Sequence, residues 1–182
     1  MTDSLQRDTI RASLVNEIQT ANMSDLPCFL DLEFSSPDEG QFPIAIAWSL
    51  PDGSIKAVMV CPDDDWEPWD NTEAELDLQF YLDQGVSGPD IIREINEDLS
   101  GQTVFIDGLD EDEAMLELLF ETYDNSPDFE LASLTDLIRD IGLEELILRR
   151  QDIANHQGLD LSNAEDTVRA NLFLAVETTA RP

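Results

Sequence analysis

Short apolar runs and stretches of helical periodicity alternate along the chain, and the short runs come first. Pro27 to Phe34 is an apolar run bounded by turn-forming residues, which predicts a buried central strand. Phe42 to Leu50 and Ile55 to Cys61 predict two more strands. Asp52-Gly53 lies between them and favours a hairpin, so we expect an antiparallel meander.

Helical periodicity dominates the rest of the sequence, interrupted by two further short apolar runs. Thr103 to Ile106 predicts a strand that is reached through a helix and should therefore lie parallel to its neighbour, and Phe129 to Leu131 predicts a last strand. Helices are expected at 3–21, 72–82 and 89–99. A further helix is opened by Asp107 to Asp112 and runs to about Tyr123, and others are expected at 134–141, 143–154 and from Ser162 or Asn163 onward.

These elements predict an α/β fold. We expect a mixed five-stranded sheet, with three antiparallel strands followed by parallel ones and helices on both faces. The length of 182 residues and the apolar content of 42% suit one core. The expected organisation is an N-terminal helical extension over 1–26 and a single domain over 27–182.

Charge is the most unusual global property, because 41 acidic and nine basic residues give a formal net charge of -32. The acids are spread along the whole chain, which favours adaptation to a salt-rich cell. The alternatives are that the protein imitates a polyanion or that it is disordered. The apolar content weakens the last of these. No run approaches the about 18 apolar residues of a membrane span, and the polar N-terminus lacks a signal-peptide core, so a cytoplasmic location is expected. Cys28 and Cys61 are expected to be buried thiols.

Two acids interrupt the first predicted strand. Asp31 and Glu33 are two residues apart, so they point to the same face of the sheet. No basic residue lies nearby in the sequence, and two desolvated carboxylates then favour a divalent cation. The same spacing recurs at 65–67 and 128–130, as chance allows in so acidic a chain. Only the first copy has an apolar strand before it and a second apolar run within hairpin distance after it.

Two later helices each direct one acid inward. Asp112 shares a helix face with Leu116 and Leu119, and Asp166 shares one with Ala170 and Phe173. Carboxylates from three separate places suit two Mg²⁺ or Mn²⁺ ions, which prefer oxygen ligands. Such a pair of ions serves hydrolytic cleavage of phosphodiesters.

The motifs together resemble the DEDD-type 3′-5′ exonucleases of the ribonuclease-H-like superfamily, specifically a small single-domain bacterial subgroup. The resemblance spans roughly residues 27 to 178 and is carried by FLDLE at 29–33, PIAIAWSLPDG at 43–53, VFIDGLDED at 104–112 with Leu116, and NAEDTVRA at 163–170. It implies removal of nucleotides from the 3′ ends of single-stranded DNA or RNA. It also implies that the ligands of two Mg²⁺ or Mn²⁺ ions are Asp31, Glu33, Asp112 and Asp166.

The sequence departs from the histidine type of this family at the general base. Members of that type carry a histidine five residues before the last aspartate, and Leu161 occupies this position here. The only histidine, His156, lies ten residues before Asp166 in a predicted loop. It is the candidate general base if the loop brings it to the metals, and otherwise a solvated polar residue.

The competing interpretation is a catalytically inactive acidic interaction protein on a nuclease fold, either a nucleic-acid mimic or a metal-dependent binding module. The net charge favours it, because nucleic-acid binders usually have basic patches. Four arginines near the predicted site speak for a nuclease, unless they only balance neighbouring acids: Arg139, Arg149, Arg150 and Arg169. The sequence leaves a homodimer open and predicts no membrane partner.

Overall fold

The sheet confirms the predicted fold class. The computed structural model describes residues 26–35, 41–66, 78–107, 111–139 and 141–179. Five strands lie in the order β3-β2-β1-β4-β5, with antiparallel pairing of β1, β2 and β3 and parallel pairing of β1, β4 and β5. This is a ribonuclease-H-like topology. The strands are β1 (Cys28–Phe34), β2 (Pro43–Ser49), β3 (Ile55–Met59), β4 (Thr103–Ile106) and β5 (Glu130–Ser133).

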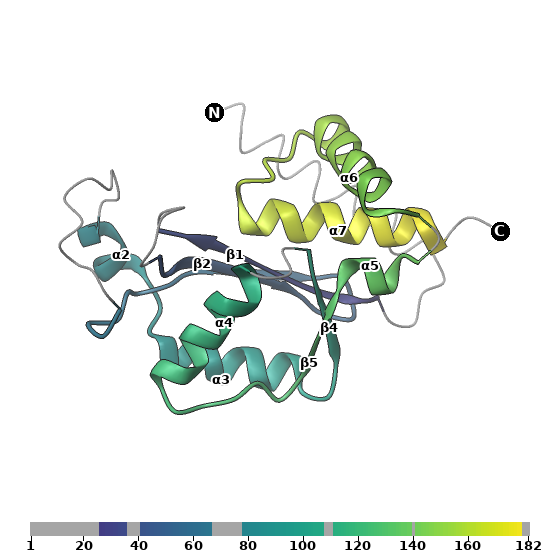
Figure 1. Ribbon diagram of the computed structural model, residues 1–182. Helices are drawn as coiled ribbons and strands as arrows, with labels where there is room; N and C mark the ends of the chain where they lie inside the picture. Colours follow the sequence, from purple (N-terminus) through teal and green to yellow (C-terminus); the bar gives the residue numbers. More distant parts are fainter. Residues whose placement is uncertain (1–25, 36–40, 67–77, 108–110, 140, 180–182) are drawn as a thin grey trace.

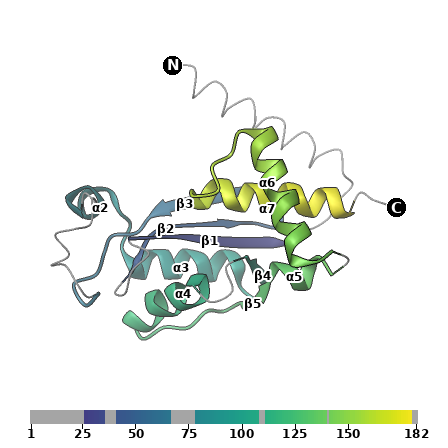
Figure 2. The same cartoon turned by 45° about the horizontal axis from the view of Figure 1, so that its top comes forward.

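Helices cover both faces of this sheet, as predicted. In Figures 1 and 2, α6 and α7 lie above the sheet, whereas α3 and α4 lie below it. The described helices are α2 (Leu78–Gln84), α3 (Gly88–Leu99), α4 (Glu111–Thr122), α5 (Leu134–Leu137), α6 (Leu143–Gln157) and α7 (Ala164–Thr179). None of the described helices is long and apolar enough to cross a membrane.

The alternation of side chains along β1 produces two apolar cores, one on each face. Leu30 and Leu32 belong to the core shared with α3 and α4. Phe29, which points the other way, belongs to the core shared with α6 and α7. Asp31 and Glu33 continue the side of Phe29, so the strand directs its two acids toward the α7 face. Phe29 and Leu30 are fully buried, which fixes the register of the strand.

Several expectations about the elements need correction or lie outside the described residues. The helix expected at 134–141 is shorter, because α5 ends at Leu137. The loop expected around His156 is instead the last turn of α6. Gly158 follows as the C-cap in a left-handed conformation (φ 68°). The helix expected at 3–21, and with it the extension over 1–26, falls almost wholly outside the described residues, as does most of 72–82.

Neither of the two cysteines forms a disulfide. Cys28 is buried in β1, as expected, whereas Cys61 is only half-buried.

Candidate metal centre

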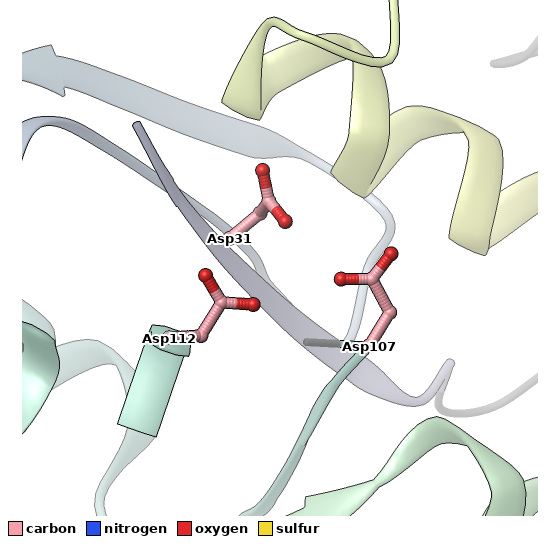
Figure 3. Close-up of side chains that lie close together, drawn as sticks. All are labelled: Asp31, Asp107 and Asp112. Carbon is pink, nitrogen blue, oxygen red and sulfur yellow. The ribbon is translucent and has the colours of Figure 1, made fainter. Parts of the chain in front are cut away.

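Three aspartates from separate elements meet at one edge of the sheet. Asp31, Asp107 and Asp112 each offer a carboxylate oxygen, and these oxygens all lie within 4.8 Å of one another. Figure 3 shows one side chain on β1, one directly after β4 and one at the start of α4. Two of the three were predicted from the sequence.

The pairing of β1 with β4 explains why Asp107 joins the cluster. These parallel strands pair Cys28 with Val104 and Phe29 with Phe105. Continued by two residues, the same register places Asp107 beside Asp31. Because the carboxyl ends of parallel strands lie at the same edge of a sheet, the residue following β4 meets the middle of the longer β1.

Asp112 reaches the cluster from the first turn of α4. Its side chain is 5% exposed, and Leu116 and Leu119 on the same helix are buried below it. The helix phase therefore directs Asp112 inward as expected, while the neighbouring Glu111 and Glu113 are exposed. A carboxylate in the first turn is also stabilised by the helix dipole.

Burial of Asp31 strongly opposes its ionisation. The residue is 9% exposed, and desolvation is the main cause that raises its pKa to about 8. The charge of Asp112 raises this pKa further, whereas Arg150 and a hydrogen bond donated by the Thr167 hydroxyl lower it. Asp31 is thus a carboxyl whose ionised form needs more positive charge than these neighbours supply.

Arg150 brings the nearest described positive charge into the cluster. Its guanidinium, on α6, forms an ion pair with Asp107, and both side chains are largely buried, at 17% and 15% exposure. Arg150 also acts electrostatically on Asp31, and its own pKa is lowered by desolvation. The cluster therefore includes one partly compensating cation of its own.

Glu33 and Asp166 have other described partners. Oε1 of Glu33 accepts hydrogen bonds from the Asn163 side chain (3.0 Å) and from the backbone N–H of Ala164 (2.9 Å), at the start of α7. Asp166 pairs with Arg169 (2.8 Å) and accepts from the backbone N–H of Asp160 (3.0 Å).

Neither residue is part of the three-carboxylate group found among the described residues. Thr167, the neighbour of Asp166, is an α7 residue that forms a hydrogen bond with Asp31. A metal-ligand role for Glu33 and Asp166 stays a prediction.

His156 lies on the exposed side of α6. Its ring Nδ1 is 2.7 Å from the backbone carbonyl oxygen of Asp152 in the same helix. It is six residues beyond Arg150, which at 3.6 residues per turn is roughly two-thirds of a turn around the helix and about 9 Å further along its axis. The catalytic role expected for His156 gains no support from this position and stays a prediction.

The other three arginines singled out in the sequence interact with residues on their own segments. Arg149 pairs with Glu145, and Arg169 with Glu165 and Asp166. Arg139 donates to the backbone carbonyl of Asp136. For these three residues, the structure favours local interactions over a shared basic surface.

Sequence reasoning missed Asp107 and the contact of Arg150. The signal for Asp107 was its position directly after the strand predicted to run parallel to β1, where side chains of two neighbouring strands meet. No comparable signal marks Arg150, because its pairing with Asp107 depends on how α6 packs across the edge of the sheet.

Comparisons with known proteins find similarity in structure but not in sequence. No family model and no curated protein matches the sequence. A chain in a solved structure of the yeast NOT1 MIF4G domain co-crystallized with CAF1 is similar, with a TM-score of 0.56 and 10% sequence identity. The match covers 93% of this chain and 84% of that chain. At this identity the likeness shows the fold alone.

Proposed function

We propose that this chain is a divalent-metal-dependent phosphodiesterase that removes nucleotides from the 3′ ends of single-stranded nucleic acid. The observation that carries the proposal is the convergence of Asp31, Asp107 and Asp112 on a ribonuclease-H-like sheet. The direction of attack and the substrate class rest on the resemblance of the sequence motifs to DEDD-type exonucleases.

The chemistry of the three side chains fits a hard cation. Mg²⁺ and Mn²⁺ prefer carboxylate oxygens. Such an ion would supply the positive charge that the ionised form of Asp31 needs in its buried position. When bound, a divalent ion lowers the pKa of a coordinated water and stabilises negative charge on phosphate oxygens. The protein holds its three carboxylates on a strand, a strand end and a helix start, which limits their movement.

The described geometry supports a site for one ion. A second ion, as expected from the sequence, needs further ligands, and the carboxylates of Glu33 and Asp166 are hydrogen-bonded or ion-paired elsewhere. We therefore assign the ligand role to Asp31, Asp107 and Asp112 and propose one resident ion, with Mn²⁺ and Mg²⁺ as the candidates.

The decisive experiment is degradation of 5′-labelled single-stranded DNA and RNA with Mn²⁺, with Mg²⁺ and with a chelator. A nuclease of this kind produces a ladder that shortens from the 3′ end and disappears with chelator. Asp112→Asn should abolish the ladder, whereas Glu113→Gln, which removes an exposed acid from the next position of α4, should not. Full activity in Asp112→Asn would refute the proposed site.

A non-catalytic acidic interaction protein remains the second candidate. The observation that favours it is the ion pair between Arg150 and Asp107, which places a protein cation where a metal would bind. The net charge of -32 also opposes approach of a polyanion. A parent protein that binds metal but degrades no oligonucleotide over a wide range of salt concentration would favour this candidate.

A further inference from the structure

We propose that the guanidinium of Arg150 is the resident counter-ion of the carboxylate cluster and competes with a divalent cation for Asp107 and Asp31. The inference deepens the proposed function and rests on its metal site. Arg150 would set the concentration at which the ion enters: the metal must displace the guanidinium, so removal of this side chain should tighten metal binding.

The first argument is position. Arg150 comes from α6, whereas Asp107 follows β4, so their ion pair connects the helical layer to the edge of the sheet. The guanidinium also interacts electrostatically with Asp31. One positive charge thus acts on two of the three carboxylates proposed as metal ligands.

The second argument is the contrast with other arginines. Arg93, Arg149 and Arg169 form their described ion pairs with acids three or four residues away on the same helix. The pairs of Arg93 and Arg149 are the more exposed ones, and such pairs contribute little to stability. Arg169 is as buried as Arg150, but both of its acids lie on its own helix. The pair of Arg150 joins residues that are distant in sequence and largely buried, so it is part of the cluster and not of a helix surface.

The third argument is that the guanidinium is incompletely satisfied. Its Nε is buried and has no hydrogen-bond partner within the described part of the chain. A buried ion pair repays its desolvation only when the remaining donors are also bonded, so this pair is held less firmly than a fully bonded one. The side chain is 17% exposed, which leaves it a route to water when a metal replaces it.

The test is calorimetric titration of the full-length protein with Mn²⁺. Arg150→Gln should bind Mn²⁺ at least about fivefold more tightly than the parent, the lower end of typical coupling between two binding events. Arg149→Gln is the matched control, because it removes a neighbouring arginine of α6 that pairs only locally with Glu145 among the described residues. Its affinity should equal that of the parent.

A second variant and a folding measurement guard against a trivial result. Arg150→Met keeps an unbranched apolar chain and should show the same gain if Arg150→Gln fails to fold, with folding followed by circular dichroism. Adding Asp107→Asn to the tighter-binding variant should abolish the gain. Equal or weaker Mn²⁺ binding by folded Arg150 variants would overturn the competition.

Failure of the competition and failure of the proposed function give different results. If the parent binds Mn²⁺ and cuts oligonucleotides while Arg150→Gln gains no affinity, the competition is wrong and the phosphodiesterase stands. The competition is also wrong if the one effect of Arg150→Gln is a higher KM for the oligonucleotide. Arg150 would then bind a phosphate of the substrate. If Arg150→Gln gains affinity but no protein cuts, the competition stands alone. Absence of Mn²⁺ binding in every variant would overturn both.

Discussion

Asp31 is a residue at which the fold strongly opposes an ionised side chain. Its pKa rises from 3.8 to about 8, mainly through burial. Between these values the folded protein retains a proton that the unfolded chain has lost. The folded state is therefore favoured at low pH, and this contribution to stability decreases as the pH rises through that interval.

The first prediction is that Asp31→Asn makes the metal-free protein less sensitive to pH. The amide cannot ionise. The free energy of unfolding of the variant should therefore increase relative to that of the parent between pH 5 and 8, by at most about 1.4 kcal/mol per pH unit. Urea unfolding in the presence of a chelator measures the free energy of unfolding of each protein. Glu113→Gln serves as the control and should follow the parent. Parallel pH curves for Asp31→Asn and the parent would show that Asp31 is not held protonated.

His156 provides a second test at the scale of one residue. Because its side chain is exposed on α6 and turned away from the direction of Arg150, we expect His156→Ala to leave the nuclease rate within about twofold of the parent. A general base would lower the rate by roughly 10²- to 10⁴-fold. The measurement is the initial rate of 3′ trimming with saturating Mn²⁺. A loss of that size would restore the role that the sequence suggested.

At the scale of elements, Glu33 connects β1 to the start of α7. Its carboxylate accepts from the Ala164 N–H and from the Asn163 side chain, a favourable position for a negative charge at a helix N-terminus. The sequence-based resemblance instead makes Glu33 a metal ligand. The two roles have different consequences for the same substitution.

The third prediction is that Glu33→Gln mainly affects stability. The amide keeps an acceptor but loses the charge, so the free energy of unfolding should fall by about 0.3–1 kcal/mol. Mn²⁺ affinity should fall much less than in Asp107→Asn, measured under the same conditions. If Glu33→Gln and Asp107→Asn weaken Mn²⁺ binding equally, Glu33 is a ligand and the site extends along β1.

The sequence predicts the elements well and their contacts across the sheet less well. The meander and the parallel fourth strand follow from local signals: apolar runs, the Asp52-Gly53 turn and a helix between two strands. Asp112 follows from helix phase. Asp107 does not, because its place beside Asp31 depends on the register of two strands that are more than 70 residues apart.

Asp166 shows the same limit within one helix. Helical periodicity placed it on an inward face, but α7 begins at Ala164, and an acid so near a helix start can interact with the preceding loop. Arg169 lies one turn later and pairs with it. The next residue, Thr167, interacts with Asp31. Periodicity predicts the face of the helix on which Asp166 lies, but not these local partners.

At the scale of the whole molecule, the net charge of -32 opposes both compaction and substrate binding. Dissolved ions reduce this repulsion, because the Debye length falls from about 30 Å at 0.01 M salt to about 8 Å at 0.15 M. The described basic residues are few, and most of them already pair with acids, among them Lys56 with Glu94 and Asp98. Solvent ions must therefore balance most of the charge.

The last prediction is that salt stabilises this fold, with most of the gain at low concentration. The urea midpoint should rise steeply between about 0.01 and 0.2 M NaCl and flatten above, because screening is nearly complete once the Debye length is shorter than the spacing of the charges. A repulsive mechanism requires KCl to act as NaCl does, since only ionic strength matters. A midpoint that is constant at low salt and rises only at molar concentration would point instead to exclusion of salt from the protein surface.

An increase from about 0.01 to 0.2 M NaCl should also raise the rate of the proposed nuclease. Ordinary nucleic-acid binders instead lose affinity as salt increases.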